Sequence, residues 1–567
     1  MDDYLTKIEH EGFVIVESEE EAGRIAELVR YDANIRVEKR GRKYIFYKKE
    51  KEAEISTKLL DSLIPDGVRF FLDHFAECYA EIEINGHKEI LPIRSDGYKR
   101  YVTIWLTNNE KLPSREKISQ LVAISEAKAI TSGLRFTLHN RSARLDNSIY
   151  IDLTREDYKV MQIKQGECIL TDTQVPTFRR YAHMKEIKVD TTGTHEDYEK
   201  FLDLLNLNQK QRLLYSIYVP TNFIPDMPHP VLIVTGSQGS AKTTLFDATR
   251  RIIDNSEVRI LSLTNNQNDF IQQLQHNYAP FYDNIRELYD WQADMLSRAS
   301  TGEGVMKRAL YTNDDAVFYK YKRCIGINGI NLPTIQSDLL DRAIVFNLER
   351  ISKEKRLTSE EVQVKIEELM PKVLGFLFTS LAKALQEVDN VKAELNGKLP
   401  RMADFTVYGE AIARSMGCKP YDFYNAYMEN ILESNKIAVI ENPIGNLVIE
   451  FLQDKPDTYE IGATEFYSSL ELFGKAKGID LKANRCGAPH ILTRRLNLLK
   501  ANLMELGIDF TTNRDSKARL YTFKRSVISV NAASGVIKAY EHNDDNDPND
   551  AVLQKDLAGF AEDPAFA

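Results

Sequence analysis

The stretch GSQGSAKTT, from Gly236 to Thr244, decides how the centre of this chain is interpreted. It follows the apolar run VLIVT at 231–235 and precedes LFDATRRII at 245–253, so a buried strand, a glycine-rich turn and an amphipathic helix are expected in succession. The spacing is close to G-x-x-x-x-G-K-[ST], the pattern of a phosphate-binding loop. Ala241 stands where that pattern has its second glycine.

The backbone of this loop determines its chemistry. Successive N–H groups of residues 237–243 would surround a triphosphate at the N-terminus of the following helix, where the helix dipole and unpaired donors favour anions. Lys242 would reach the β- and γ-phosphates, and the hydroxyl of Thr243 would bind Mg²⁺. ATP and Mg²⁺ are therefore the expected ligands. The predicted nucleotide-binding residues of the loop are Gly236, Ser237, Gln238, Gly239, Ser240, Ala241, Lys242, Thr243 and Thr244.

The Cβ of Ala241 leaves one question open. If this position requires a positive φ, alanine costs about 1 kcal/mol relative to glycine and could crowd the phosphate. If the helix has already begun there, alanine is favoured over glycine by a similar amount. The residue type alone does not decide between these two cases.

Three polar residues downstream lie at the ends of predicted strands or helices. Asp283 ends the short β-like run in HNYAPFYDNIREL, where a Walker B aspartate would hold Mg²⁺. Asn328 ends the next strand, CIGING, where a sensor of water or of the γ-phosphate would lie. Arg342, in SDLLDRAIVFNL, lies between a helix and a strand, where it could reach the phosphate of a neighbouring subunit. The four elements in this order are far more specific than any one of them.

The loop, Asp283, Asn328 and the stretch DLLDR at 338–342 together resemble an AAA+ ATPase of the helicase clade. The chain is similar to the minichromosome maintenance helicases, whose loop contains Ala-Lys-Ser, and to the superfamily-three helicases of viruses and plasmids. It most resembles the compact replicative ATPases of phages, plasmids and other mobile elements. The resemblance covers residues 200–430 and leaves 1–190 outside it.

This resemblance implies roles for the catalytic residues and an assembly. Lys242 and Thr243 become ligands of phosphate and Mg²⁺, Asp283 becomes the Walker B metal ligand, and Asn328 becomes sensor 1. ATP would lie between the subunits of a homo-hexameric ring.

Two arginines receive roles from the same resemblance. Arg342 becomes an arginine finger that acts in trans. Arg401, in LPRMADF, becomes the sensor 2 of a helical lid and thus a nucleotide-binding residue.

The residue after the Walker B aspartate departs from the family pattern. Such ATPases have glutamate there to activate the attacking water, whereas this chain has Asn284. An amide can orient a water molecule but cannot accept its proton. Glu287 could supply the carboxylate from the following turn. Otherwise hydrolysis would be slow or would use another base, and the sequence leaves these alternatives open.

Composition limits the class of protein. The chain has 567 residues and a net charge of -10, which suggests several domains and argues against nucleic-acid binding over the whole surface. Its five cysteines are scattered, so neither a disulfide framework nor a zinc site is supported. No apolar run approaches the ~20 residues that span a bilayer, and the first residues are acidic where a signal peptide would be basic, so a cytoplasmic location without membrane partners is expected.

Pattern and composition predict an α/β multidomain protein with an AAA+ P-loop core. The predicted units are a small α/β unit (1–60), an α+β accessory domain (65–190), the P-loop ATPase core (195–352), a helical lid (353–438), a winged-helix DNA-binding domain (440–526) and an acidic disordered tail (527–567). The accessory domain lacks the paired carboxylates of a primase, so we assign it to loading, oligomerisation or DNA contact.

Two regions are predicted to contact DNA. Two β-like runs around TNDD, between Asp283 and Asn328, predict a hairpin that would grip single-stranded DNA in the pore of the ring. Its candidate cations are Lys320, Lys322 and Arg323, although Asp314 and Asp315 occupy the turn itself.

Residues 481–525 carry ten Lys or Arg and only three acidic residues, so the winged helix is locally basic. Its third helix and its wing are expected to contact the phosphates of double-stranded DNA. The candidate residues are Arg494, Arg495, Lys500, Arg514, Lys517 and Arg519. A solvated protein-interaction domain is the alternative.

Three functions remain after these inferences. The first is an ATP-dependent DNA helicase or replication initiator of a mobile element or virus. The second is a DNA-binding initiator or regulator that uses ATP as an assembly switch without unwinding, which Asn284 favours. The third, a metabolic P-loop kinase or transporter ATPase, is disfavoured by Arg342 and the winged helix. The tail could dock replication proteins or merely increase solubility.

Overall fold

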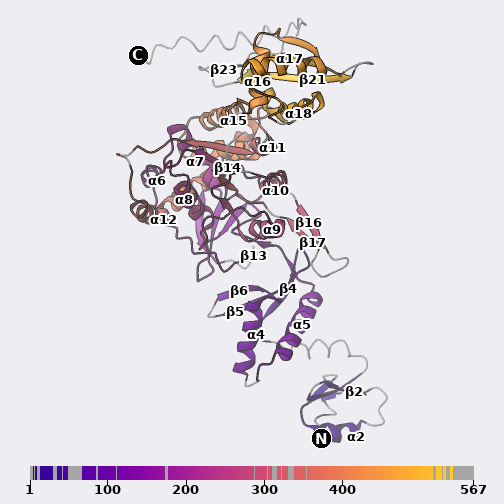
Figure 1. The fold of residues 1–567 in the computed structure, drawn as a ribbon. Helices are drawn as coiled ribbons and strands as arrows, with labels where there is room; N and C mark the ends of the chain where they lie inside the picture. The colour runs from indigo at the N-terminus through magenta and orange to yellow at the C-terminus, as the bar shows by residue number, and fades with distance from the viewer. Residues whose placement is uncertain are drawn as a thin grey trace.

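A four-stranded parallel sheet forms the centre of the computed structural model (Figure 1). In spatial order its strands are β15 (Phe281–Tyr282), β18 (Gly326–Asn328), β14 (Val231–Gly236) and β19 (Ala343–Leu348). Around it lie α6 (His195–Leu202), α7 (Gln209–Thr221), α8 (Lys242–Asp254), α9 (Gln267–His276), α10 (Asp290–Thr301) and α11 (Ser337–Leu340). Because all four strands are parallel, their carboxyl ends lie at the same edge of the sheet.

The structure describes most of the chain, and the mixed α/β multidomain class is confirmed. The described residues are 4, 7–8, 13–29, 35–40, 42–48, 65, 67–84, 87–109, 112–172, 177–286, 288–302, 304–308, 316–320, 322–329, 337–352, 354, 356–440, 442–484, 486–514, 519–525, 528–530 and 537–539. The predicted residues Glu287, Asp314, Asp315 and Lys517 and the stretch 541–567 lie outside them.

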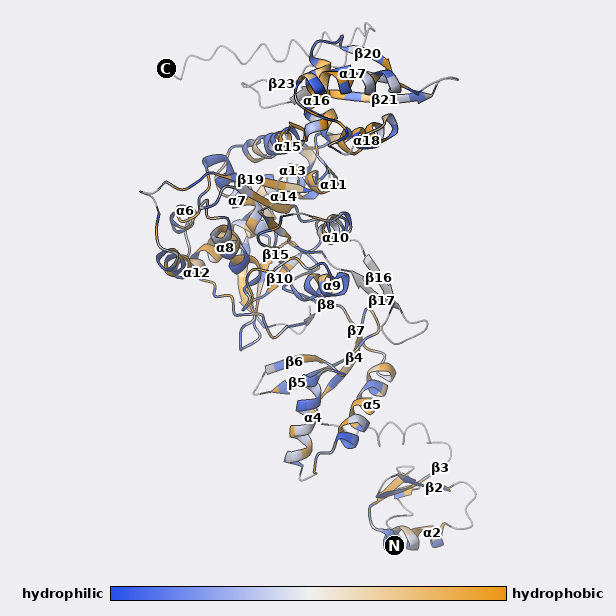
Figure 2. Cartoon of the chain, viewed as in Figure 1, coloured by the Kyte–Doolittle hydropathy of each residue, from blue (hydrophilic) through white to orange (hydrophobic). Residues whose placement is uncertain are grey.

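Alternate side chains of β14 enter two different hydrophobic clusters. Leu232 and Val234 pack in the cluster that contains residues of α7 and α8, whereas Val231 and Ile233 pack in the cluster that contains residues of α9 and α10. Successive strand side chains point to opposite faces, so helices cover both faces of the sheet. This burial explains the unbroken apolar run of the strand. Figure 2 shows α9 and α10 as largely hydrophilic helices on the outside of this part.

Four helices follow the central sheet: α12 (Ser359–Ala384), α13 (Val388–Glu394), α14 (Ala403–Ser415) and α15 (Asp422–Ile440). Thr358 and Glu361 form a capping box at the start of α12. This cap fixes where the connection from β19 ends and the longest of the four helices begins. Side chains of α12, α14 and α15 share one hydrophobic cluster with α7 and α8. The helical unit is therefore packed continuously onto the central sheet.

The C-terminal unit has a hydrophobic cluster of its own. It consists of α16 (Pro443–Gln453), β20 (Thr458–Gly462), α17 (Ala463–Ala476), α18 (Pro489–Glu505), β21 (Ile508–Arg514) and β22 (Arg519–Arg525). The three strands form an antiparallel sheet in the order β20-β22-β21. β20 lies between α16 and α17 in the chain and pairs with β22.

Residues 65–190 form two sheets with different packing partners. The first, in the order β6-β5-β4-β7, packs under α4 and α5 with its own cluster. The second, β12-β11-β10-β9, contributes to the cluster of the central sheet and α12. The bounds are β4 (Arg69–Asp73), β5 (Cys78–Ile84), β6 (His87–Pro92), α4 (Asp96–Asn108), α5 (Arg115–Thr131), β7 (Arg135–Phe136), β9 (Ser142–Leu145), β10 (Ser148–Asp152), β11 (Val160–Lys164) and β12 (Glu167–Thr171). A two-stranded sheet joins β8 (Leu138–His139) and β13 (Thr177–Phe178).

The described ends of the chain contain small units. The N-terminal unit has a sheet in the order β1-β3-β2, built from β1 (Phe13–Val16), α2 (Glu19–Leu28), β2 (Ile35–Arg40) and β3 (Lys43–Lys48). Beyond residue 527, β23 (Ile528–Val530) and β24 (Ile537–Ala539) pair antiparallel. Both strands lie within 527–567, the stretch predicted to be an acidic disordered tail, and they are the part of it that the structure describes. Among the helices that the structure describes, none is long and apolar enough to cross a bilayer.

A buried ion pair joins the second sheet of residues 65–190 to the end of α8. Arg141, which is fully buried, donates through Nε and Nη2 to Oδ1 of Asp254 at 3.1 and 2.9 Å. Its Nη1 donates to the carbonyl oxygen of Asp152 at 2.7 Å. Burial alone would raise the pKa of Asp254, but the charges of Arg141 and Arg250 outweigh it and hold that pKa below its usual value. Asp254 is therefore an anion shared by two buried cations.

Replacing Asp254 by asparagine is expected to destabilise the protein by about 3 kcal/mol, because it leaves two buried guanidinium groups without an anion. Denaturant unfolding of the purified chain measures this change. Glu20→Gln is the control, since Glu20 and Arg24 form an ion pair whose side chains are 77% and 58% exposed and such pairs contribute little. Equal losses of stability in the two variants would contradict the assignment.

Candidate nucleotide site and nucleic-acid surfaces

The predicted loop joins β14 to α8, and its glycines have backbone conformations that other residues rarely adopt. The φ angles of Gly236 and Gly239 are +138° and +78°. A Cβ added to Gly236 would lie 2.3 Å from the carbonyl oxygen of Leu348 on the neighbouring strand. Only glycine therefore fits at Gly236 without moving β19.

Ala241 has a left-handed conformation, with φ 62° and ψ 30°, and the helix α8 begins at the next residue. The question left open by the sequence is answered by this geometry: alanine occupies a position that favours glycine. A left-handed alanine costs about 1 kcal/mol, so the loop is held by its surroundings in a mildly strained conformation.

The two predicted metal ligands lie side by side although they are distant in sequence. The hydroxyl Oγ1 of Thr243 donates to Oδ2 of Asp283 at 2.8 Å. Lys242 is the residue before Thr243, and its Nζ donates to the carbonyl oxygens of Gly236 and Ser237 in the loop at 2.8 and 3.0 Å. The carboxyl edge of the sheet thus carries a hydroxyl and a carboxylate in contact and an ammonium group on the loop, which are the group types expected for Mg²⁺ and phosphate.

The buried Asn328 positions the backbone that follows Asp283. Its Oδ1 accepts the N–H of Asn284 at 3.1 Å, and its main-chain oxygen accepts the N–H of Ile285 at 2.9 Å. Its Nδ2 is buried and has no hydrogen-bond partner among the described residues. Asn284 itself is left-handed, with φ 57°, a conformation that asparagine tolerates better than most residues.

A cavity of about 380 Å³ opens beside Asp283 and Asn284. Its remaining walls come from the chain at 262–265 and from the turn after β15, and the lining residues are Ser262, Leu263, Asn265, Ile285, Arg286 and Tyr289. The side chain of Asn284 is exposed, so it faces solvent beside the carboxylate of Asp283.

Arg342 lies at the opposite edge of the sheet from its own loop. Ala343, the next residue, pairs with Val231 at the start of β14, whereas Gly236 pairs with Leu348 at the strand ends. The length of β14, about 20 Å at 3.3 Å per residue, separates the two edges. Arg342 therefore cannot reach a nucleotide on its own loop.

Arg401 lies with Arg342 rather than with the loop. Its Nη2 contacts Oδ1 of Asp338 at 2.5 Å and its Nη1 contacts Oδ2 of Asp341 at 3.2 Å. Arg342 forms an ion pair with the same Asp338. Burial raises the pKa of Asp341, although Arg401 opposes this effect. Arg401 therefore lies near Arg342 and away from its own loop, and its nucleotide-binding role stays a prediction.

Two of the three hairpin cations lie at the base of the hairpin formed by β16 (Gly304–Arg308) and β17 (Ala316–Lys320). Arg323 is buried, and its guanidinium donates to the carbonyl oxygens of Leu274 and Gln275 at 2.5 and 3.1 Å, at the end of α9. Lys322 donates to the carbonyl oxygen of Asp226. This placement corrects the expectation that Arg323 contacts DNA. Of Lys320 the structure describes only the main chain.

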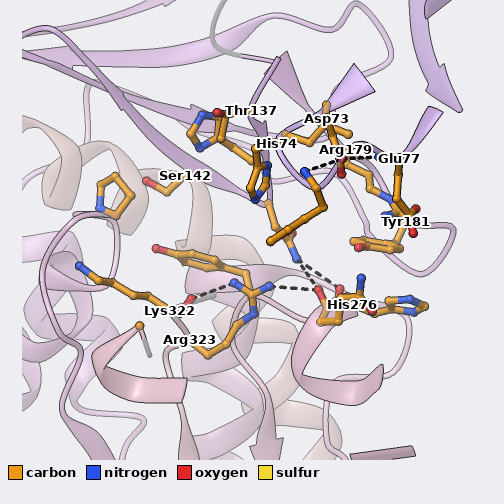
Figure 3. A pocket seen from close by; sticks show the side chains of 18 of the residues that line it. Asp73, His74, Glu77, Thr137, Ser142, Arg179, Tyr181, His276, Lys322 and Arg323 are labelled. Atoms are coloured by element: carbon orange, nitrogen blue, oxygen red, sulfur yellow. Dashed lines mark hydrogen bonds between the residues drawn. The ribbon is translucent and has the colours of Figure 1, made fainter. Parts of the chain in front are cut away.

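Figure 3 shows Lys322 and Arg323 on the wall of a cavity of about 650 Å³ that is also lined by residues 73–79 and 275–278. Burial lowers the pKa of His139 and His276, which also line it, to about 4, so both rings are neutral near pH 7. Asp73 and Glu77 lie beside a third cation, Arg179, and across the cavity from Lys322 and Arg323 (Figure 3). The cavity is thus no concentrated basic surface.

The basic residues of the C-terminal unit differ in exposure. Arg494 and Arg519 are exposed and Arg495 is half-buried. Lys500 pairs with Asp509 at 3.6 Å and lies over the ring of Phe510, so it packs within the unit.

One side chain of α18 also contacts the helical unit. Asn502 of α18 donates to Asn435 of α15 at 2.7 Å, which fixes this helix against the helical unit. The main chain of Arg514 belongs to β21, and its side chain lies outside the described atoms.

Three residues at the loop had no sequence signal of their own. Asn206 donates through Nδ2 to the carbonyl oxygens of Ser240 and Glu349 at 3.1 and 2.6 Å. Arg350 and Arg356 lie next to Gly239. Only the pairing of β14 with β19 brings residues 349–356 to the loop, so a pattern search of one segment could not find them.

The central part of the chain has a family match. Residues 199–434 match the model of the actinomycete integrative conjugative element replication protein. The matched segment contains the loop, Asp283, Asn328, Arg342 and Arg401. It supports a role in DNA replication and a mobile-element context. No curated protein matches the chain.

Solved structures give weaker likenesses. The A form apo structure of the NrS-1 C-terminal region has a TM-score of 0.36 and 12% identity, and the match covers 82% of this chain and 98% of that one. A second apo structure of the NrS-1 C-terminal region (305–718) has a TM-score of 0.34, 12% identity and the same coverage. A JCV helicase bound to a small molecule has a TM-score of 0.21 and 12% identity over 40% of this chain and 68% of that one.

Ala241→Gly is expected to raise the free energy of unfolding by about 1 kcal/mol, because glycine adopts the left-handed conformation without a Cβ clash. Denaturant unfolding measures it. Ala426→Gly, within the helix α15 (Asp422–Ile440), is the matched control and should lower stability by about 1 kcal/mol. A loss of stability in both variants would contradict the strain at Ala241.

Proposed function

We propose that this chain is an ATP-dependent DNA helicase or replication initiator that acts as a ring on DNA and hydrolyses ATP at subunit interfaces. The observation that carries the proposal is the 2.8 Å hydrogen bond between Thr243 and Asp283 beside Lys242. Thr243 and Asp283 are the predicted ligands of Mg²⁺, and Lys242 is the predicted ligand of phosphate. The family match to a replication protein over 199–434 supports the same proposal.

The residues present fit ATP and Mg²⁺. Thr243 and Asp283 would hold the metal ion, which would neutralise charge on the phosphates. Lys242 would leave the carbonyl oxygens of the loop to bind phosphate, an exchange that an ammonium on a flexible stem allows. The unpartnered Nδ2 of Asn328 would donate to a water molecule or to the terminal phosphate. The chain would thus bind and orient the reactants at one edge of the sheet.

Completion of the site would require a second subunit. Arg342 lies at the edge of the sheet remote from its own loop, so its proposed action is on a neighbour's nucleotide. Arg401 shares Asp338 with it, and the two arginines would be presented together. The proposed homo-hexameric ring provides this arrangement.

We assign contact with DNA to the hairpin β16–β17 and to the exposed arginines of the C-terminal unit. Single-stranded DNA would meet the hairpin β16–β17 in the pore. Double-stranded DNA would meet the C-terminal unit, which we propose to be a winged helix, through the exposed Arg494 and Arg519 and the half-buried Arg495. These contacts would bind phosphates and so weaken steeply with salt.

An Arg342→Ala ring is expected to lose at least about a hundredfold in ATPase rate, because the charge that develops in the transition state loses its stabiliser. Lys242→Ala subunits have an intact Arg342 but a defective loop. Mixing the two variants should therefore restore part of the activity, measured as phosphate release at constant total protein. Normal hydrolysis by Arg342→Ala alone, or no recovery in the mixture, would contradict action in trans.

A second function is favoured by Asn284. Its amide lies beside Asp283 where a catalytic carboxylate is expected, and it cannot remove a proton from water. Under this alternative the protein is an ATP-switched DNA-binding initiator or regulator that assembles without unwinding.

Strand displacement on forked DNA separates the two functions. The helicase proposal predicts ATP-dependent displacement by the wild-type protein and none by Lys242→Ala, since translocation requires hydrolysis. Sizing of the protein with ATP provides the parallel measurement of assembly. DNA binding and ATP-dependent assembly without displacement would favour the switch.

A further inference from the structure

We infer that Arg350 and Arg356 bind the phosphates of the nucleotide in cis, as two further cations beside Lys242. This inference rests on the proposed function, because it requires that the loop hold a nucleotide. It extends that function by naming the residues that link the nucleotide to the helical unit.

The parallel sheet forces the chain after β19 to pass the loop. β14 and β19 are neighbours, and Gly236 pairs with Leu348 at the ends of the two strands. Neighbouring strands lie about 4.8 Å apart. Arg350 follows Leu348 by two residues, so it must leave the sheet at the edge where the loop lies.

Hydrogen bonds then hold this segment against the loop. The N–H of Ile351 donates to the carbonyl oxygen of Gly239 at 3.2 Å. Asn206 connects the same two segments, since its Nδ2 donates to the carbonyl oxygens of Ser240 and Glu349. The position of residues 349–351 is therefore determined by the loop itself.

Both guanidinium groups lie at one residue of the loop. A Cβ built on Gly239 would lie 3.2 Å from Nη2 of Arg356 and 4.0 Å from Nε of Arg350. Both side chains are exposed. The planar fork of arginine matches phosphate oxygens, which makes these side chains suitable phosphate ligands.

The electrostatics favour an anion at this place. Two arginines, Lys242 and the N-terminus of α8 all bring positive charge to the loop. Within the part of the chain that the structure describes, neither Arg350 nor Arg356 forms an ion pair. At the opposite edge, by contrast, Arg342 and Arg401 are paired with Asp338. Asp338 of α11 thus pairs with the arginines at that edge, whereas the pair at the loop is left to a ligand.

A contact with Arg356 would also position the helical unit. The capping residue Thr358 of α12 follows Arg356 by two residues. A nucleotide held by Arg356 would therefore fix the start of α12 relative to the loop, and removal of the nucleotide would release that restraint.

Nucleotide affinity tests the inference directly. Arg350→Gln, Arg356→Gln and the double variant are titrated with Mg²⁺ and fluorescent N-methylanthraniloyl derivatives of ADP and ATP. Each single substitution should weaken binding by about tenfold, since it removes a charge-assisted hydrogen bond, and the double variant should bind more weakly still. Arg356→Lys should restore part of the affinity, because it keeps a positive charge.

Two controls show whether a loss of nucleotide affinity comes from a lost phosphate contact. Arg100→Gln makes the same change of charge at an exposed position on α4, and its affinity should equal that of the wild type. Inorganic tripolyphosphate should displace the fluorescent nucleotide about tenfold less effectively from each single glutamine variant. Unfolding curves that match the wild type show that the variants are folded.

The outcomes separate this inference from the proposed function. If the wild type binds no nucleotide, the proposed function fails. If the wild type binds and the glutamine variants bind equally well, the inference is overturned. If nucleotide binding weakens but competition by tripolyphosphate does not, the arginines contact the base or ribose and the assignment to phosphates is overturned.

Discussion

The parallel pairing of β14 with β18 and β19 is the constraint on which the candidate site depends. Parallel strands end at a common edge, so the loop after β14 meets Asn328 from β18 and the turn after β15 that carries Asp283. The same pairing sends Arg342 to the far edge and returns Arg350 to the loop. One register thus decides which groups lie at the loop and which lie at the opposite edge of the sheet.

The loop helix is also tied to residues outside the central sheet. Asp254, at the end of α8, accepts hydrogen bonds from Arg141 and from the N–H groups of Tyr278 and Ala279. Removing these groups from water is costly, so the network persists only because each charge has a close partner. This network ties the end of α8 to β10 in the second sheet of residues 65–190, because Arg141 also donates to the carbonyl oxygen of Asp152.

Local pattern predicted the strand, loop and helix around Gly236 and the polar strand ends at Asp283 and Asn328. It succeeded because side-chain periodicity and glycine conformations act within a few residues of one another. It failed for Arg323, whose basic neighbours suggested a DNA-binding surface. The last carbonyl groups of a helix lack partners within that helix, and Arg323 satisfies those of α9. That requirement comes from a helix about 50 residues earlier in the chain, beyond the reach of a local pattern.

The sequence by itself determined the mixed α/β fold class, the phosphate-loop pattern and the order of the residues expected around that loop, because these depend on residue type and short spacing. The tertiary structure alone decided the left-handed backbone of Ala241, the pairing of Arg401 with Asp338 and the approach of Arg350 and Arg356 to Gly239. Each of these depends on how strands and helices distant in sequence pack together. Close packing places particular atoms of these segments within a few ångströms of each other. The order of residues along the chain does not specify those distances.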